Sequence, residues 1–253
     1  MIEKGAGALG VSWSLGDWIP VLRRLPAQAG KAVALTIDDA PTAEATPMVL
    51  DLLDQFGAKA TFFLSGCRAE PRFDLVEEIV RRGHWVYAHG WEHIRLDKVG
   101  SDRLRSDMER CEALLAKVRP TPVPYLVRLP QNGGYRKASV HHALKRWQPG
   151  CQFAHWGAST EDHLISPRCS HDGDVEPQCR REVERLLASP RLAGAILLMH
   201  DQPINERPGA AFKAAVTITL TRLLLEGLSS AGYSFAPITP LPAQSWWTRF
   251  ALV

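Results

Sequence analysis

The chain has 253 residues, of which 45% are apolar, and its formal net charge is +3. This length fits one large α/β domain or two small ones, and the apolar share is enough for a sizeable core. The nearly balanced charge gives no strong field for nucleic acid or a membrane surface, and the arginines form no patch with interleaved aromatic residues. We therefore expect neither of these partners.

The N-terminal region and the cysteines bear on the cellular compartment. The first thirty residues contain Gly, Asp, Arg and Lys but no continuous apolar segment, which argues against a secretory signal. No stretch reaches the roughly 20 apolar residues needed to span a bilayer. The five cysteines are an odd number, which fits a reducing compartment. The sequence thus predicts a cytoplasmic protein, with export left open if the chain is a trimmed form.

Short apolar strands alternate with amphipathic helices along the chain. The predicted strands are 32–37, 59–64, 84–88, 124–128, 151–155, 194–199 and 233–236. The predicted helices are 44–56, 71–82, 101–118, 136–146, 176–188 and 210–230. This alternation predicts a parallel sheet, either open or closed into a barrel.

Two segments allow more specific predictions of local structure. The helix over 101–118 begins with Ser101, which could cap it. One face of this helix is apolar and consists of Leu104, Met108, Cys111, Leu114 and Leu115. The segment from Ser166 to Pro177 has no apolar periodicity, so we expect most of 156–177 to be a long loop that could wall or cover a site.

The strand over 32–37 leads directly into two carboxylates, Asp38 and Asp39. Two carboxylates at the end of a buried strand are unfavourable unless a cationic group lies beside them. On its own, an Asp-Asp pair before Pro41 and Thr42 would more often form a turn or a helix cap. The pair therefore needs a second signal before it indicates a functional site.

That second signal is the pair of histidines at positions 89 and 93. A spacing of four residues would place both rings on one side of a helical turn, where His89 and His93 could share one metal ion. One aspartate and two histidines leave a fourth position for water, which is the layout of a catalytic zinc site. Because imidazole and carboxylate also suit cobalt, nickel and manganese, these metals remain alternatives to zinc. A lone buried histidine is more often a hydrogen-bonded core residue, so the prediction depends on the pair.

The polar residues that follow the predicted strands are expected to meet. Asp38, His89, Arg128 and His200 each lie at or just past the C-terminal end of a strand. In a βα barrel these strand ends form one rim, where active sites lie. The sequence thus predicts one cleft built from segments that are far apart in the chain.

Five segments match a known pattern in their order and spacing. They are Thr36-Ile37-Asp38-Asp39-Ala40, His89-Gly90-Trp91-Glu92-His93, Arg128-Leu129-Pro130-Gln131, Ser159-Thr160-Glu161-Asp162-His163 and Leu197-Leu198-Met199-His200. Together they resemble the five motifs of the polysaccharide deacetylases of the NodB-homology type, carbohydrate esterase family four. The resemblance implies a distorted (β/α) barrel of about seven parallel strands. The domain would span 31–240, with an N-terminal extension over 1–30 packing on the barrel and a C-terminal tail over 241–253 that contains Trp246 and Trp247.

The resemblance also implies a role for each motif residue. Asp39, His89 and His93 would hold the divalent cation, and Asp38 would act as the general base. Arg128 would pair with Asp38, although it could simply neutralise a surface acid. His200 would be the general acid, rather than a capping residue at a strand end.

Further implied roles concern the histidine that protonates the leaving group and the contacts to the substrate. Asp162 would orient His200, although it could be an ordinary loop residue. A backbone N–H near Gln131 would stabilise the developing oxyanion. Trp91 and Trp156 could stack on a sugar ring, although most tryptophans pack in cores.

The motifs depart from the family pattern at several positions. Gly90 replaces a hydroxyl residue that supports the metal shell, and Gln131 replaces an aromatic residue. Ser159 and His163 replace the first acid and the last aromatic residue of the fourth motif. We therefore expect a metal-dependent hydrolase that removes an acyl group, foremost N-acetyl, from an amino sugar or glycoconjugate. Hydrolysis of a small cyclic amide or imide or of an acylated non-sugar metabolite, or ligand binding without catalysis, are the alternatives.

Overall fold

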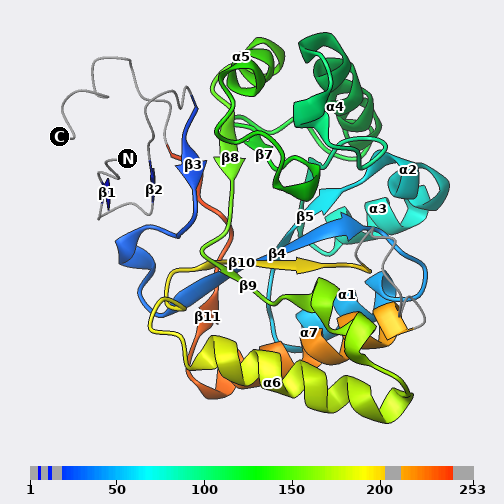
Figure 1. Ribbon diagram of the computed structural model, residues 1–253, viewed down its shortest axis with the longest axis vertical. Helices are drawn as coiled ribbons and strands as arrows, with labels where there is room; N and C mark the ends of the chain where they lie inside the picture. Colours follow the sequence, from blue (N-terminus) through cyan, green and yellow to red (C-terminus); the bar gives the residue numbers. More distant parts are fainter. Residues whose placement is uncertain (1–4, 7–10, 13–18, 203–211, 242–253) are drawn as a thin grey trace.

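The computed structural model describes residues 5–6, 11–12, 19–202 and 212–241 of the chain (Figure 1). The predicted tail with Trp246 and Trp247 lies outside these residues. Among the described residues, no helix is long and apolar enough to cross a membrane.

Two sheets occupy the centre of the molecule. The first has the order β6 (Trp85–Ala88), β5 (Ala60–Leu64), β4 (Ala32–Ala40), β10 (Ile196–His200) and β9 (Ala158–Ser159), and β11 (Ser234–Phe235) also pairs with β4. The second has the order β1 (Gly5–Ala6), β2 (Val11–Ser12), β3 (Val21–Leu22), β8 (Gln152–Ala154) and β7 (Leu126–Val127). All pairings are parallel except β1 with β2 and β2 with β3. Each predicted strand is present, and the short strands β1, β2, β3 and β9 were not predicted.

Helices surround the sheets (Figure 1). They are α1 (Thr46–Gln55), α2 (Gly66–Ala69), α3 (Phe73–Arg81), α4 (Ser101–Leu115), α5 (Ala138–Trp147), α6 (Val175–Leu187) and α7 (Lys213–Ser230). Short 3-10 turns occur at η1 (Ala27–Ala29), η2 (Glu70–Arg72), η3 (Leu96–Lys98), η4 (Pro130–Asn132), η5 (Asp162–Leu164), η6 (Ser166–Arg168) and η7 (Asp172–Asp174). The predicted alternation of strands and helices is therefore present, apart from 203–211, which lies outside the described residues.

Two local predictions were wrong. Ser101 is the first residue of α4 rather than its cap, because Gly100 occupies the cap position and no side chain caps the helix. The predicted long loop between Ser166 and Pro177 contains η6 and η7, and α6 begins at Val175. Proline is tolerated in the first turn of a helix, where its missing N–H would have no partner, so Pro177 does not delay the start.

The core includes every residue of β4 and part of the N-terminal segment. All nine residues of Ala32–Ala40 are buried, as expected for a central strand of a parallel sheet. In the segment before β4, Ile19, Val21, Leu22 and Leu25 are also buried, and β3 pairs with β8. The described parts of the predicted 1–30 extension thus supply three strands, β1, β2 and β3, to the second sheet.

The strand register places the polar ends of β4 and β10 side by side. His200 pairs with Asp38 in the parallel ladder. After Asp38 the β4–β5 register shifts, and Asp39 has φ of +68°. This β-bulge changes the direction of the chain at the end of β4. Bulges are common beside functional sites, where they reorient a side chain.

Candidate metal and catalytic site

Asp39, His89 and His93 form a buried three-residue cluster, with Asp39 in the last residues of β4 and the two histidines just after β6. Their ligand atoms all lie within 4.8 Å of one another. Asp39 Oδ1 is 3.0 Å from His93 Nε2 and 3.7 Å from His89 Nε2. The structure thus brings together the three residues that the sequence assigned to the cation.

The protonation states of this cluster suit a cation. Burial would raise the pKa of Asp39, but the hydrogen bond to His93 and the nearby imidazoles lower it below its ordinary value. Burial lowers the pKa of His89 despite the opposing carboxylates of Asp38 and Asp39. His89 Nδ1 is 2.8 Å from the carbonyl oxygen of Arg128, which fixes the N–H on Nδ1 and leaves Nε2 as the lone-pair atom. One carboxylate and two imidazoles with an oriented ring form a donor set that fits zinc.

The loop that carries the two histidines is not the predicted helical turn. No helix covers 89–93, and the chain instead bends with φ of +81° at Gly90 and +54° at His93. A spacing of four residues is compatible with a helical turn, but it does not require one. Here the bend, rather than helical periodicity, brings the ring of His93 within 5.4 Å of the ring of His89.

The buried carboxylate of Asp107, on α4, supports this loop. Asp107 Oδ1 accepts the N–H of Trp91 at 2.6 Å, and the residue is 5% exposed. A Cβ added to Gly90 would lie 2.9 Å from the same oxygen. Asp107 therefore fills the space beside position 90 that a side chain would need, which gives a physical reason for glycine there.

Asp38 lies next to the cluster and is held by Arg128. Arg128 donates from Nη1 to Asp38 Oδ1 at 2.8 Å and to Thr36 Oγ1 at 2.7 Å. Its Nε donates to the carbonyl oxygen of Ala154 at 2.7 Å, and both Asp38 and Arg128 are 3% exposed. Burial lowers the pKa of Arg128, while Asp38 opposes that change. Arg128 therefore does not serve as a partner for a surface acid, which was the alternative reading of this residue.

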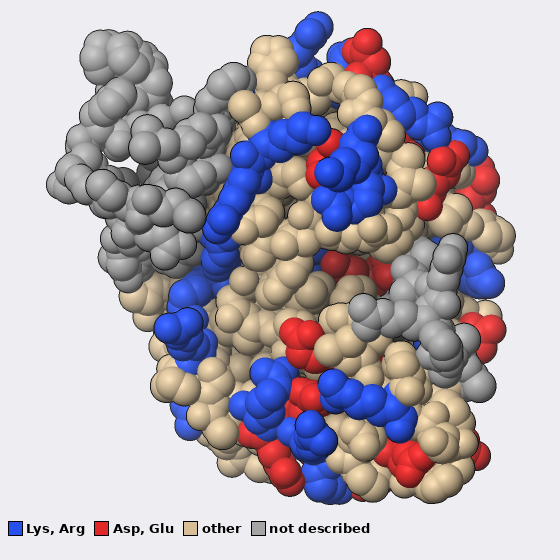
Figure 2. Space-filling view, viewed as in Figure 1, with Lys and Arg blue, Asp and Glu red and all other residues tan. Residues whose placement is uncertain are grey.

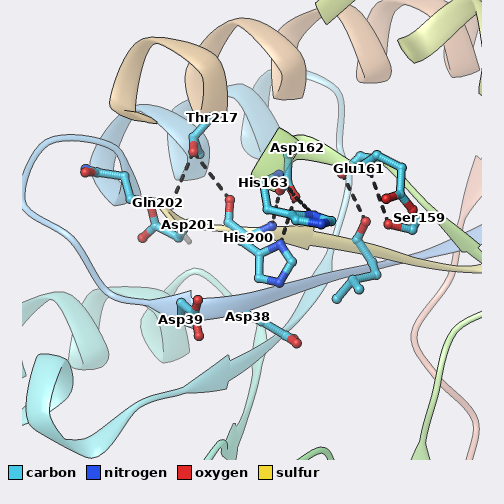
Figure 3. Close-up of polar contacts among 12 residues, drawn as sticks. Asp38, Asp39, Ser159, Glu161, Asp162, His163, His200, Asp201, Gln202 and Thr217 are labelled. Carbon is cyan, nitrogen blue, oxygen red and sulfur yellow. Dashed lines mark hydrogen bonds and ion pairs between the residues drawn. The ribbon is translucent and has the colours of Figure 1, made fainter. Parts of the chain in front are cut away.

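His200 faces Asp38 and Asp39 from the neighbouring strand (Figure 3). Its Nδ1 is 2.8 Å from Asp162 Oδ1, and its backbone N–H donates to Asp162 Oδ2 at 2.5 Å. Burial lowers the pKa of His200, but the charge and hydrogen bond of Asp162 outweigh this effect and raise it to about 10. Asp162 is 3% exposed, so it is not an ordinary loop residue. The structure therefore brings together the proposed general acid and its orienting carboxylate.

Two residues beside the site were missed in the sequence. Arg68 Nη1 donates to the carbonyl oxygens of Asp39, Asp201 and Gln202, at 2.7, 2.9 and 2.7 Å. Asp201 accepts from the N–H of Thr42 at 3.0 Å and from its hydroxyl at 2.9 Å, and burial raises the pKa of Asp201 to about 6. These contacts tie the end of β10 to the turn after β4. The position of Asp201 directly after His200 was the available sequence signal, whereas Arg68 offered none.

The predicted substrate contacts differ in their placement. Trp91 is buried against Gly66, with the guanidinium of Arg110 3.5 Å from its ring centroid. This packing contradicts the predicted stacking of Trp91 on a sugar, because the ring is already covered by protein. Gln131 is exposed with φ of +54°, and its side chain donates to the carbonyl oxygen of His93 at 3.4 Å. Trp156 is half-buried and stacks on His155 with the ring centroids 4.1 Å apart.

Comparison with known proteins identifies relatives. Residues 26–147 match the family model described as polysaccharide deacetylase. Over 211 residues the chain is 29% identical to a peptidoglycan-N-acetylglucosamine deacetylase of Bacillus cereus, covering 83% of this chain and 88% of that protein. It is also 29% identical over 215 residues to the peptidoglycan-N-acetylglucosamine deacetylase PgdA of Listeria monocytogenes, covering 85% of this chain but only 40% of that longer protein.

The fold is likewise similar to solved structures. A family 4 carbohydrate esterase from Streptomyces lividans, solved in complex with acetate, superposes with a TM-score of 0.64 at 23% identity, covering 85% of this chain and 96% of that one. The likeness confirms the expected α/β fold with parallel strands, of the distorted (β/α) barrel kind.

Proposed function

Because this chain belongs to the polysaccharide deacetylase family, we propose that it removes an N-acetyl group from an amino sugar or glycoconjugate with the help of a bound divalent cation. The observation that carries this proposal is the placement of Asp38 and His200, on paired strands, beside the cluster of Asp39, His89 and His93. Hydrolysis of an amide needs a base, an acid and an electrophile at one point, and these residues can supply or hold all three.

Each residue has a role that follows from its contacts. Arg128 occupies Asp38 Oδ1, which leaves Oδ2 to accept a proton from the attacking water. Asp162 holds His200 through Nδ1, so a proton on Nε2 is available for the leaving amine. A cation held by Asp39, His89 and His93 would polarise the acyl oxygen and lower the pKa of water, and zinc is our first choice for it.

Acetate release from N-acetylated sugars tests the function. The chelator-treated protein and the same protein reloaded with zinc should be compared on N-acetylglucosamine oligomers and on peptidoglycan fragments. We expect acetate only from the metal-loaded protein, and a loss of about 100-fold or more in kcat for Asp38→Asn. A panel with hydantoin-like cyclic amides tests the alternative substrate class. Equal activity of the chelated and metal-loaded forms would contradict the metal-dependent mechanism.

Two broader predictions accompany this proposal. We propose that residues 31–240 form the catalytic domain; the family model matches residues 26–147, which cover the N-terminal part of this range. The predicted cytoplasmic location implies a precursor or free metabolite as substrate, rather than mature cell wall. Fractionation of cells that express the protein would test that location.

A further inference from the structure

The short helix α2 contacts the loop that carries the two histidines of the cluster. The N–H of Gly66 donates to the carbonyl oxygen of Gly90, and the N–H of Cys67 donates to that of Trp91, each at 3.0 Å. A Cβ added to Gly66 would lie 2.3 Å from the ring of Trp91, so no side chain fits between the helix and the loop there. The main chain of α2 therefore holds this loop from one side.

A side chain of the same helix, Arg68, binds the ends of two strands. Its Nη1 donates to the carbonyl oxygen of Asp39, in the last residues of β4, at 2.7 Å. The same nitrogen donates to the carbonyl oxygens of Asp201 and Gln202, directly after β10, at 2.9 and 2.7 Å. A terminal guanidinium nitrogen carries two hydrogens, so three carbonyl oxygens share two N–H groups and one positive charge. The negative ends of these converging carbonyl dipoles would repel one another without a cation between them.

Two of the three residues that Arg68 binds have a left-handed backbone. The angle φ is +68° at Asp39 and +56° at Gln202. This conformation is unfavourable for residues with a Cβ, and it persists where the surroundings determine it. Because Arg68 binds the carbonyl oxygens of both residues, it is one of the groups that hold the chain in this conformation. The direction of the Asp39 carboxylate depends on the same backbone, so Arg68 acts on a candidate metal ligand through the main chain.

Arg68 also links the strand of the metal ligand to the strand of the general acid. His200 pairs with Asp38 at the end of the ladder between β4 and β10, and the N–H of Asp201 donates to the carbonyl oxygen of Asp38 at 2.8 Å. Beyond this pair, Arg68 makes the next link between the two strands. The position of the general acid relative to the cation cluster therefore depends on that link.

Negative charge is concentrated at these strand ends. Asp38, Asp39 and Asp201 are each at most 3% exposed. On the face shown in Figure 2, acidic side chains lie at the floor of a hollow. Burial raises the pKa of Asp201 to about 6, and the charge of Arg68 counters part of that change. Arg68 thus stabilises a buried carboxylate as well as the carbonyl oxygens.

We propose that Arg68 is a positioning residue for the proposed deacetylation, and that it fixes Asp39 and His200 relative to each other through main-chain carbonyl oxygens. The catalytic part of this inference rests on the proposed function, whereas its effect on cation binding follows from the geometry of the cluster. Because the contacts of Arg68 are to main-chain oxygens, a small cation with N–H donors that enters the same space should replace its side chain.

Chemical rescue tests the inference. Arg68→Ala leaves three carbonyl oxygens around a space that guanidinium ion from solution can enter. We expect calorimetry on the chelator-treated protein to show zinc binding weakened about ten-fold, and about 10 mM guanidinium chloride, too little to unfold the protein, to restore most of it. Tetramethylammonium chloride at the same concentration, which has no N–H donor, should not restore it. In the zinc-loaded protein, kcat for acetate release should fall about ten-fold with KM little changed, and guanidinium should restore it in the same way.

The exposed Arg81 of α3 provides the matched control. Its side chain is 71% exposed and pairs with Glu78, so Arg81→Ala should bind zinc as the wild type does and should not respond to guanidinium. If circular dichroism shows that Arg68→Ala does not fold, Arg68→Lys and Arg68→Met replace it. Both side chains are long and unbranched, but only lysine keeps a charge and N–H donors, so Arg68→Lys should bind zinc several-fold more tightly than Arg68→Met.

The outcomes separate this inference from the proposed function. Unchanged zinc affinity in Arg68→Ala, a loss that guanidinium does not restore or that tetramethylammonium restores equally, or equal affinities of Arg68→Lys and Arg68→Met would overturn the inference. If no sugar releases acetate while zinc binding depends on Arg68 and guanidinium as expected, the proposed deacetylation is contradicted and the positioning of the cation cluster by Arg68 is supported.

Discussion

At the scale of single residues, Asp162 sets the charge of His200. Burial disfavours the imidazolium, yet Asp162, with smaller contributions from Asp39 and Asp38, raises the pKa of His200 to about 10. The imidazolium is therefore the resting form at neutral pH in the metal-free protein. A protonated ring held through Nδ1 is the state that a general acid needs before it can donate from Nε2.

Replacing Asp162 should reduce this shift. In Asp162→Asn the largest of the effects that raise the pKa of His200 is lost while burial remains, so this pKa should fall well below about 10, although Asp39 and Asp38 still raise it. NMR titration of the metal-free protein would measure the shift, and kcat of the loaded enzyme at pH 8 should fall about 100-fold. The exposed His171→Ala provides a control, because it removes an imidazole elsewhere. An unchanged His200 titration would contradict the assignment.

The same pair makes stability depend on pH. Because the folded pKa of His200 is raised, its contribution to the free energy of unfolding is fully present below about 6.5. That contribution declines as pH rises, and it is lost as pH passes through about 10. Urea unfolding of the metal-free protein between pH 6 and 10 should show this decline in the wild type. The decline should be much smaller in Asp162→Asn, and equal slopes for the two proteins would contradict the linkage.

At the scale of the elements, the loop from His89 to His93 depends on α4. Asp107 binds the amide of Trp91 from the helix, and it occupies the space beside Gly90. Outer groups that orient metal ligands commonly change metal affinity by 10- to 100-fold when they are removed. Asp107 is therefore expected to position the ligands without contacting the cation.

Zinc titration of Asp107 variants tests this support. We expect Asp107→Ala to weaken zinc binding about ten-fold, and Asp107→Asn to restore much of the loss, because its amide oxygen can still accept the N–H of Trp91. Asp102→Ala on the exposed face of α4 provides the matched control. Equal zinc affinities for Asp107→Ala and Asp102→Ala would show that the carboxylate does not position the loop.

Individual elements also show which features could be predicted from the sequence and which could not. The strand over 32–37 could be predicted because its apolar run and flanking Gly30 and Pro41 are local signals. The bend from His89 to His93 could not, since a spacing of four residues fits a helix equally well. Arg68 could not be found either, because it binds main-chain oxygens, which leave no mark in the sequence.

At the scale of the whole molecule, the two sheets are joined by side chains where β6 and β7 meet. The hydroxyl of Tyr125 accepts the N–H of Ala88 at 2.8 Å and donates to Glu112 Oε2 at 2.6 Å. Arg119 then binds both oxygens of Glu112 and the carbonyl oxygen of Val86. This buried network links the second sheet to the edge of the first, close to the segment that leads to His89.

Removing the Tyr125 hydroxyl should weaken this hydrogen-bonded link between the two sheets. Tyr125→Phe leaves the N–H of Ala88 and the carboxylate of Glu112 each without one partner, so we expect the free energy of unfolding to fall by about 1–3 kcal/mol. Urea denaturation would measure it. Tyr233→Phe, at a half-buried position after α7, should change stability by less than about 0.5 kcal/mol. Similar losses in both variants would argue against a specific role for the network.

The proposed hydrolysis depends on a cation held by Asp39, His89 and His93, and zinc titration of the chelator-treated protein tests this most directly. Calorimetry should show one zinc bound per chain in the wild type. His93→Ala and Asp39→Ala should each weaken that binding at least about 100-fold, since each removes one of three ligands. His171→Ala should bind as the wild type does. A wild-type protein that binds no zinc, cobalt, nickel or manganese, or ligand variants that bind as tightly as the wild type, would contradict the account.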